Sequence, residues 1–288
     1  MILAATIGGL LTLLFWGVSD YLAGKSGKTA DEYLTNFVIQ TVGALVLVPV
    51  VIYYGLSVEL NASLLPVILI AALFTVAYVA FVKALTIGPF GVAVPIANAY
   101  TLVTMAIGLL FFNFQISVSE LIVLVVIVLG VIFLAVNKTT FSLKNFRGST
   151  VYFSFVTLFC WGVAFALVDV SSKIFPWHEL LFMIAMIMSI LGFLYYVIVR
   201  KKLPPLHEMR YANMKYAWWS GVFISLGAIA FYVSVSVTGS VVIPAVIASA
   251  SPIVTSFCAY YWDKEKLDVF KRAGAVLVIV GIMLLNLL

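Results

Sequence analysis

Ten long apolar segments, separated by short polar connections, restrict how this chain can fold more than any other feature. They cover approximately residues 2–24, 33–54, 64–86, 91–112, 117–136, 149–171, 178–199, 212–237, 241–261 and 268–288. A helix needs about 20 mostly apolar residues to cross about 30 Å of hydrocarbon. The segments are continuous and do not alternate between apolar and polar residues, which favours helices over barrel strands. The sequence therefore predicts an all-α integral membrane protein with ten transmembrane helices.

The composition excludes several other classes of protein. Hydrophobic types make up 65% of the 288 residues and charged types 9%, against about half and a quarter in soluble domains. A soluble globule, a disordered chain, a disulfide scaffold and a nucleic-acid-binding module are therefore excluded. Cys160 and Cys258 lie in apolar runs and are interpreted as packing residues. The two histidines, His178 and His207, lie in connections, so we expect no metal site and no cofactor.

The basic residues predict the orientation in the membrane. Fourteen of the sixteen Lys and Arg residues lie in or beside the connections after the first, fifth, seventh and ninth segments. Cytoplasmic loops carry an excess of Lys and Arg, so these connections are predicted to face the cytoplasm and both termini to lie outside it. The first segment lacks the basic start of a signal peptide and is interpreted as a retained helix. We expect a multi-pass protein of the cell membrane, the inner or plasma membrane.

An internal repeat divides the chain into two halves. Residues 12–28 resemble 157–173, with Trp16 and Gly17 matching Trp161 and Gly162 at a shift of 145. Further matches pair residues 88–104 with 238–255, and 126–134 with 277–285. The sequence thus predicts two five-helix repeats, at 1–140 and 145–288, joined by a basic linker at 137–148.

The odd number of helices in each repeat predicts that the two copies have opposite topology. Similar units with five spans each enter the membrane from opposite sides, and the distribution of basic loops agrees. Such inverted repeats are typical of transporters that alternate between two conformations around a site near the bilayer midplane. The alternative interpretation is a duplicated bundle without transport activity.

Several short motifs resemble those of the EamA family of the drug/metabolite transporter superfamily. They are Phe15-Trp16-Gly17, Cys160-Trp161-Gly162, and the KALTIGPFGVAVP sequence that precedes a TLVT helix. The acidic segment 262–268 also fits the family, whereas the matching segment 113–117 lacks the acid. The resemblance covers the whole chain and implies export of amino acids or other small metabolites, or movement of sugars and nucleotide-linked solutes. It also implies a cavity lined by the first, third, fourth, sixth, eighth and ninth spans. Many members are expected to have cytoplasmic termini, and the charge pattern here favours the opposite.

Few ionisable side chains lie inside the predicted spans, where such groups are costly and usually functional. Asp20 and Lys83 are interpreted either as a direct pair across the first and third spans or as residues that reach separately to the interface. Asp169 either forms an i,i+4 pair with Lys173 or, like Asp20, takes up a proton or contacts a cationic group of the substrate. Glu120 is interpreted as an acid at a helix start.

Aromatic residues and prolines complete the predicted site. Trp16 and Trp161 are interpreted as gates or stacking walls, or else as packing residues beside glycines. Pro95, Pro244 and Pro252 predict helix breaks that line the cavity, or kinks that only shape packing. The predicted substrate-binding residues are Trp16, Asp20, Tyr78, Lys83, Asn98, Tyr100, Trp161, Asp169, Tyr232, Ser249 and Ser251.

We therefore expect a secondary-active transporter that exports a small organic metabolite, an amino acid or a similar amphipathic solute, by alternating access. Its expected partners are the bilayer, the solute and a proton as candidate coupling ion, without nucleic acid, in a monomer or weak homodimer. Sugar or nucleotide-type uptake or exchange, and flipping of a lipid-linked solute, remain alternatives. An enzyme is disfavoured because GxSxG, HExxH and P-loop motifs are absent. A channel is disfavoured because the positions equivalent to Asp20 and Asp169 are Phe165 and Gly24.

Overall fold

A computed structural model describes residues 2–57, 64–88, 90–112, 114, 117–135, 148–264 and 269–285. All regular structure in these ranges is helical. The helices are α1 (Ile2–Thr29), α2 (Glu32–Tyr54), α3 (Leu64–Ile87), α4 (Phe90–Asn98), α5 (Tyr100–Phe111), α6 (Val118–Ala135), α7 (Ser149–Ser171), α8 (Trp177–Arg200), α9 (Tyr211–Thr238), α10 (Val242–Ala248), α11 (Pro252–Trp262) and α12 (Val269–Leu285). The predicted repeat boundaries at 140 and 145, most of the basic linker, and parts of the 113–117 and 262–268 motifs lie outside the described residues.

Eight helical segments in the described ranges are long and apolar enough to cross a membrane. Two of these segments combine a pair of shorter helices, α4 with α5 and α10 with α11. The apolar stretches of α6 and α12 are shorter than the other eight. Eight of the ten predicted spans are thus long and apolar enough to cross a membrane. The other two, which correspond to α6 and α12, stay predictions.

Both short-helix pairs are interrupted near their middle, as the sequence predicts, but the prolines do not all lie at the interruptions. Pro252 is the first residue of α11, directly after the break at 249–251. Pro95 lies inside α4, four residues before the break at Ala99, and Pro244 lies inside α10. The prediction that the breaks lie at Pro95 and Pro244 is therefore wrong in position. Each helix continues for about one turn after its proline.

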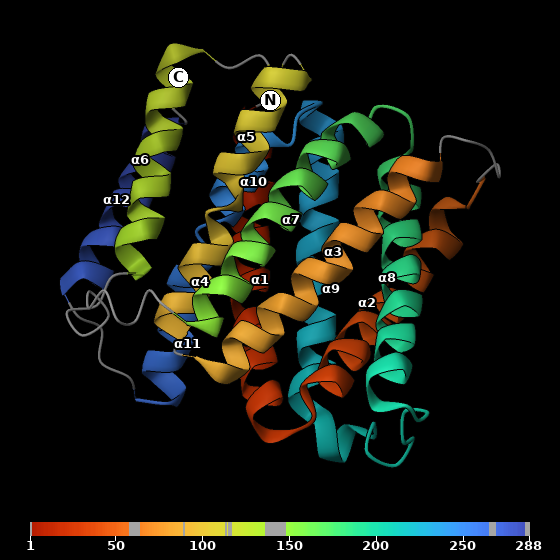
Figure 1. The fold of residues 1–288 in the computed structure, drawn as a ribbon. Coiled ribbons are helices and arrows are strands. Elements are labelled where there is room, and N and C mark those ends of the chain that lie inside the picture. The colour runs from red at the N-terminus through yellow and green to blue at the C-terminus, as the bar shows by residue number, and fades with distance from the viewer. Residues whose placement is uncertain are drawn as a thin grey trace.

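The course of the chain can be followed in Figure 1. Helix α1 descends from the upper end and α2 rises from the lower end, and the chain continues in alternating directions. Helix α7, which matches α1 in sequence, rises where α1 descends. Helices α6 and α12 lie side by side at one edge, and the beginning of α1 and the end of α12 lie at the same end of the bundle.

Contacts between the two halves are reciprocal. The Thr12 hydroxyl on α1 donates a hydrogen bond to the Gly227 carbonyl on α9 at 3.2 Å, and the matching Thr157 on α7 donates to Ala77 on α3 at 3.1 Å. The same exchange occurs one turn further along. Thr255 donates to the Gly17 carbonyl at 2.9 Å, and its counterpart Thr104 donates to the Gly162 carbonyl at 3.0 Å.

Glycine allows these close approaches. A Cβ atom added at Gly17 would lie 2.7 Å from the carbonyl oxygen of Ser251, and one at Gly162 would lie 3.0 Å from that of Tyr100. Helices in lipid associate through close packing and interhelical hydrogen bonds, because lipid tails are as apolar as the side chains. The two glycines therefore hold α1 against α11 and α7 against α5.

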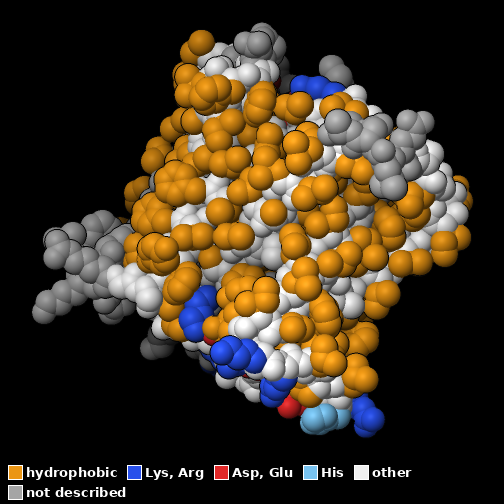
Figure 2. All heavy atoms as spheres, turned by 45° about the vertical axis from the view of Figure 1, so that its right-hand side comes forward, with side chains coloured by type: hydrophobic (Ala, Val, Ile, Leu, Met, Phe, Trp, Pro, Cys, Tyr) orange, Lys and Arg blue, Asp and Glu red, His pale blue; other side chains and the backbone are white. Residues whose placement is uncertain are grey.

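The surface of the bundle is mainly apolar. Figure 2 shows hydrophobic side chains over most of one face, with Lys and Arg side chains gathered along its lower edge. Exposed aromatic residues include Tyr53, Tyr54 and Tyr261, which suits the aromatic belts found at membrane interfaces.

We predict that Gly17→Ala and Gly162→Ala each destabilise the protein by about 1–3 kcal/mol, because the added methyl group overpacks a helix contact. The measurement is the melting temperature of the purified protein in detergent. Gly192→Ala is the matched control, since its Cβ atom would make ordinary contacts at 3.6 Å or more. Alanine's higher helix propensity should leave that variant as stable as the parent or more stable. Unchanged melting temperatures for both Gly17→Ala and Gly162→Ala would contradict the role of these contacts.

Candidate functional site

A cavity of about 120 Å³ lies in the centre of the bundle, where both helix breaks meet the long helices. It is mainly apolar, with a few polar side chains. The lining residues are Trp16, Asp20, Gln40, Gly43, Ala44, Leu47, Phe74, Tyr78, Asn98, Tyr100, Trp161, Phe165, Leu181, Ile184, Ala185, Met188, Ile224, Ser225, Ala228, Tyr232 and Ser251. Concave apolar sites with a few convergent polar groups are the usual form of small-molecule sites.

The two helix breaks supply polar groups to one side of the cavity. Asn98 ends α4, and Ser251 precedes α11. The Ser251 hydroxyl lies 3.2 Å from Asn98 Oδ1 and 3.5 Å from Asp20 Oδ2, so it can donate to either. The breaks thereby bring the two halves of the chain together around the Asp20 carboxyl group.

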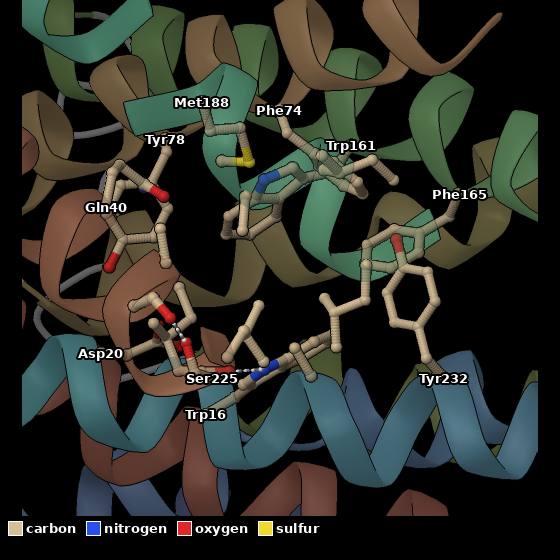
Figure 3. A pocket seen from close by; sticks show the side chains of 18 of the residues that line it. Trp16, Asp20, Gln40, Phe74, Tyr78, Trp161, Phe165, Met188, Ser225 and Tyr232 are labelled. Carbon is tan, nitrogen blue, oxygen red and sulfur yellow. Dashed lines mark hydrogen bonds between the residues drawn. The ribbon is translucent and has the colours of Figure 1, made fainter. Parts of the chain in front are cut away.

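Aromatic rings form the opposite walls. Trp16 and Trp161 lie on opposite sides of the cavity, and Phe165 lies at one end of it, on the right in Figure 3. The ring centroids of Trp16 and Phe165 are 5.9 Å apart, and Tyr100 stacks on Phe165 at 4.7 Å. The Trp16 indole donates to the Ile224 carbonyl at 3.2 Å, which fixes this ring against α9.

Several polar atoms facing the cavity lack a hydrogen-bond partner among the described residues. They are Gln40 Nε2, the Tyr232 hydroxyl and the Tyr78 hydroxyl, which lies near the Ser19 and Ser220 hydroxyls without a hydrogen bond of normal geometry. All three side chains are more than nine-tenths buried. Buried polar groups without partners are rare in native proteins, so these atoms are available to hydrogen-bond a molecule in the cavity. Gln40, Tyr78 and Asp20 lie together on one side, and Tyr232 lies across the cavity (Figure 3).

The structure brings together eight of the eleven predicted binding residues in this cavity. They are Trp16, Asp20, Tyr78, Asn98, Tyr100, Trp161, Tyr232 and Ser251. That these side chains bind substrate stays a prediction.

The other three predicted residues do not line the central cavity. Lys83 forms an ion pair with Glu32 and lines a smaller cavity. Of the two interpretations of Asp20 and Lys83, the direct pair is therefore wrong, because Lys83 pairs with Glu32 at the start of α2. Asp169 pairs with Lys173 at 2.8 Å and accepts from the Val241 amide at 2.8 Å. Ser249 donates to the Val246 carbonyl within the α10 break.

Gln40 on α2, Met188 on α8 and Ser225 on α9 also line the cavity, and the sequence did not predict these residues. Gln40 is a single amide within the apolar run of α2, which is the signal that could have identified it. Ser225 donates to the Gly43 carbonyl at 2.8 Å, which joins α9 to α2. Met188 carries no signal that separates it from the other apolar residues of α8.

Four basic residues near the helix ends are paired with acids. At the lower end of Figure 1, Lys25 contacts Asp263 at 2.9 Å, Lys83 contacts Glu32 and Arg200 contacts Asp31. Lys173 and Asp169 form the pair at the upper end. None of these basic side chains lines the central cavity.

The comparisons with known proteins agree with this architecture. A model of the EamA-like transporter family matches residues 3–136 and again residues 148–287. The chain therefore belongs to the EamA-like transporter family, and the resemblance seen in the sequence is confirmed. It is a multi-pass membrane protein with a general transporter role.

Two further comparisons were made with curated proteins and with solved structures. The search among curated proteins gives no match. A solved structure titled "Crystal structure of protein" is similar over 98% of this chain and 96% of its own, with a TM-score of 0.74 and 17% identity. At this identity the likeness shows the fold alone.

We predict a pH-dependent stabilisation by the Lys25–Asp263 pair at the lower end of the bundle. Burial raises the pKa of Asp263, but the hydrogen bonds from Lys25 and Tyr21 together with the positive charges of Lys25 and Lys28 outweigh it, so the net pKa lies below the ordinary value near 3.8. The stabilisation is therefore present above that ordinary value and is lost as the pH falls through the lowered pKa. Asp263→Asn should lower the melting temperature slightly at pH 7, since exposed ion pairs contribute roughly 0.2–1 kcal/mol.

The difference between parent and Asp263→Asn should disappear at pH values below the lowered pKa. Glu208→Gln serves as the control, because Glu208 is exposed and its only ion-pair contact among the described residues is His207 at 3.8 Å. A difference between parent and Asp263→Asn that stayed constant down to the lowest pH would contradict the ion-pair explanation.

Proposed function

We propose that this protein is a secondary-active transporter that moves a small amphipathic organic solute by alternating access around the central cavity. The observation that carries the proposal is the cavity itself. Helices of both halves line it, both helix breaks adjoin it, and it contains buried polar atoms that have no hydrogen-bond partner among the described residues. Irregular backbone at membrane depth is tolerated where it lines a cavity or is covered by protein.

The proposed mechanism depends on two inverted five-helix repeats, of which α6 and α12 would be the last spans. Two features support this arrangement. The matching helices α1 and α7 run in opposite directions in the bundle (Figure 1). The reciprocal threonine contacts of the two halves have the pattern that a two-fold relation produces. A pseudo-two-fold axis would give one chain two related conformations, each open to one side of the membrane.

The proposed orientation has both termini outside the cytoplasm of a cell-membrane protein, and the proposed direction, export, is the one that the resemblance to the family implies. The orientation is supported by the distribution of basic residues, which gather at the lower edge in Figure 2. The positive-inside rule assigns this edge to the cytoplasm. The beginning of α1 and the end of α12 lie at the other end of the bundle (Figure 1).

The cavity lining favours an amphipathic solute over the alternatives. Its surface is mainly aromatic and aliphatic, and no Lys or Arg is among the described lining residues. A sugar would need more hydrogen-bonding groups, and a nucleotide or lipid-linked phosphate would need cationic ones. The lining therefore provides support for neither alternative.

Proton coupling is assigned to Asp20 rather than Asp169. Asp20 faces the cavity and is 6% exposed, whereas Asp169 is held by Lys173 and the Val241 amide. A carboxyl group inside the membrane can be neutralised by a proton, and proton relays of pumps and transporters use such groups.

We predict that Asp20→Asn abolishes transport driven by a pH gradient in proteoliposomes, because Asp20 is the one acidic side chain among the described lining residues. Asp169→Asn should keep gradient-driven transport while lowering the melting temperature, because it loses an ion pair outside the cavity. Normal gradient-driven transport by the Asp20→Asn, Asp169→Asn double variant would refute proton coupling through either acid.

We predict that Trp161→Ala weakens solute binding about tenfold or more, because the variant removes one aromatic wall of the cavity. Stacking between two aromatic rings contributes roughly 0.5–1.5 kcal/mol in addition to the burial of their apolar surface. The solute is first identified by a thermal-shift screen of purified protein against amino acids, amines, sugars and nucleobases. Trp219→Ala is the control, because Trp219 is 48% exposed and lies outside the cavity. Equal affinities of both variants and the parent would count against the cavity as the binding site.

A further inference from the structure

We propose that the central cavity selects monovalent organic cations with an apolar body, such as arylalkyl amines, over zwitterionic amino acids and anions. The proposal rests on the proposed function and specifies its substrate class. Three observations support it: the charge of the lining, the pairing of charged residues elsewhere in the described chain, and the placement of polar atoms within the cavity.

The first observation concerns the charge of the lining. Asp20 is the one acidic side chain among the described lining residues, and no basic side chain accompanies it. Its hydrogen-bond partner is the Ser251 hydroxyl, at the long distance of 3.5 Å. A buried carboxylate with one weak neutral partner is costly unless an opposite charge or a proton neutralises it.

The second observation is that the nearby basic residues are already paired. Lys25 contacts Asp263, Lys83 contacts Glu32 and Arg200 contacts Asp31. These cations are held at the helix ends, away from the cavity lining. The described chain therefore supplies Asp20 with no cation of its own, and an ammonium group of a ligand would be the missing partner.

The placement of polar atoms indicates how such a ligand lies. The side chains of Asp20, Gln40 and Tyr78 gather on one side of the cavity, whereas Phe74, Trp161 and Phe165 lie away from Asp20 (Figure 3). Gln40 and Tyr78 present atoms without partners in normal geometry, although the Ser19 and Ser220 hydroxyls lie near Tyr78. An amine would bind with its ammonium at Asp20 and its ring between the aromatic walls, where ring–ring contacts add to the stabilisation.

The same arrangement disfavours α-amino acids and carboxylic acids. In an α-amino acid the carboxylate is attached to the carbon that carries the ammonium, so binding the ammonium at Asp20 brings two like charges together. The described lining offers that carboxylate neutral donors only, whereas carboxylates buried in proteins are normally paired with cations. Zwitterions should therefore bind more weakly than the amine with the same ring.

The experiment compares four ligands that share a phenyl ring and differ in charge. They are 2-phenylethylamine, phenylalanine, 3-phenylpropionate and the neutral 2-phenylethanol. Each is titrated against the purified full chain in detergent, and dissociation constants are obtained from the increase in melting temperature with ligand concentration. We expect the amine to bind at least tenfold more tightly than phenylalanine, and 3-phenylpropionate to cause no shift.

The variants test whether Asp20 causes this preference. Asp20→Asn should weaken binding of the amine at least tenfold and leave binding of 2-phenylethanol unchanged, which also shows that the variant is folded. Asp20→Glu keeps the charge and should retain a preference for the amine over phenylalanine. Glu120→Gln is the control for loss of an acid, because Glu120 caps the start of α6 through Ser117, outside the cavity.

Two outcomes would overturn the inference. Binding of phenylalanine or 3-phenylpropionate as tight as that of the amine would show that the cavity does not select cations, while the proposed transport of amphipathic solutes would stand. An Asp20→Asn variant that is folded and binds the amine with parental affinity would show that the Asp20 carboxylate does not bind the ammonium group. Failure of the proposed function itself is distinguishable, because then none of the four ligands would bind and Trp161→Ala would change no affinity in the wider screen.

Discussion

Lipid offers no hydrogen bonds to a peptide group, and this constraint governs the arrangement of the whole bundle. Every interruption of a membrane helix must have its polar groups satisfied within the protein. At the first break the Ala99 amide still donates to Pro95, and at the second the Ser251 amide donates to Ala248. Both interruptions are buried, and residues in them or directly beside them line the cavity, namely Asn98, Tyr100 and Ser251. The need to satisfy the backbone therefore places irregular, polar structure where a solute can be bound.

Close helix contacts connect this constraint to the cavity. Gly17 follows Trp16 in α1 and lies against Ser251, which precedes α11. The same local sequence in α7 sets Gly162 against Tyr100, the first residue of α5. Each tryptophan thus stands next to the contact that fixes a helix break. The walls of the cavity and the packing of the helices consequently depend on the same short motif in each half.

The sequence predicts the helical class, the family and eight of the 21 residues that line the cavity, because these features rest on strong local signals. Apolar length identifies spans, and a repeated Trp-Gly pair identifies equivalent positions. The errors concern long side chains and isolated residues. Lys83 could reach either Asp20 or Glu32, and only the packing of α2 on α3 decides for Glu32. Met188 was missed because an apolar side chain in an apolar helix reveals nothing about the direction it faces.

Helix breaks illustrate a second limit of sequence analysis. A proline removes one backbone donor, but the point at which the helix ends depends on the hydrogen bonds of the following turn. Pro95 therefore predicts that a break exists without giving its position. Gln40 shows the opposite case, because one amide in an apolar run is a visible signal whose meaning becomes clear once α2 is placed beside the cavity.

Helices α2 and α8 are connected by different kinds of interaction at their two ends. At one end Arg200 pairs with Asp31, and the two side chains are 39% and 24% exposed. At the other end Glu179, which is 4% exposed, accepts from the backbone amide and hydroxyl of Ser57 at 3.0 and 2.8 Å. Dissolved salt screens exposed charges strongly and buried ones weakly. Rising ionic strength therefore weakens the Arg200–Asp31 ion pair at one end of this helix pair, while the hydrogen bonds from Ser57 to Glu179 at the other end are little affected.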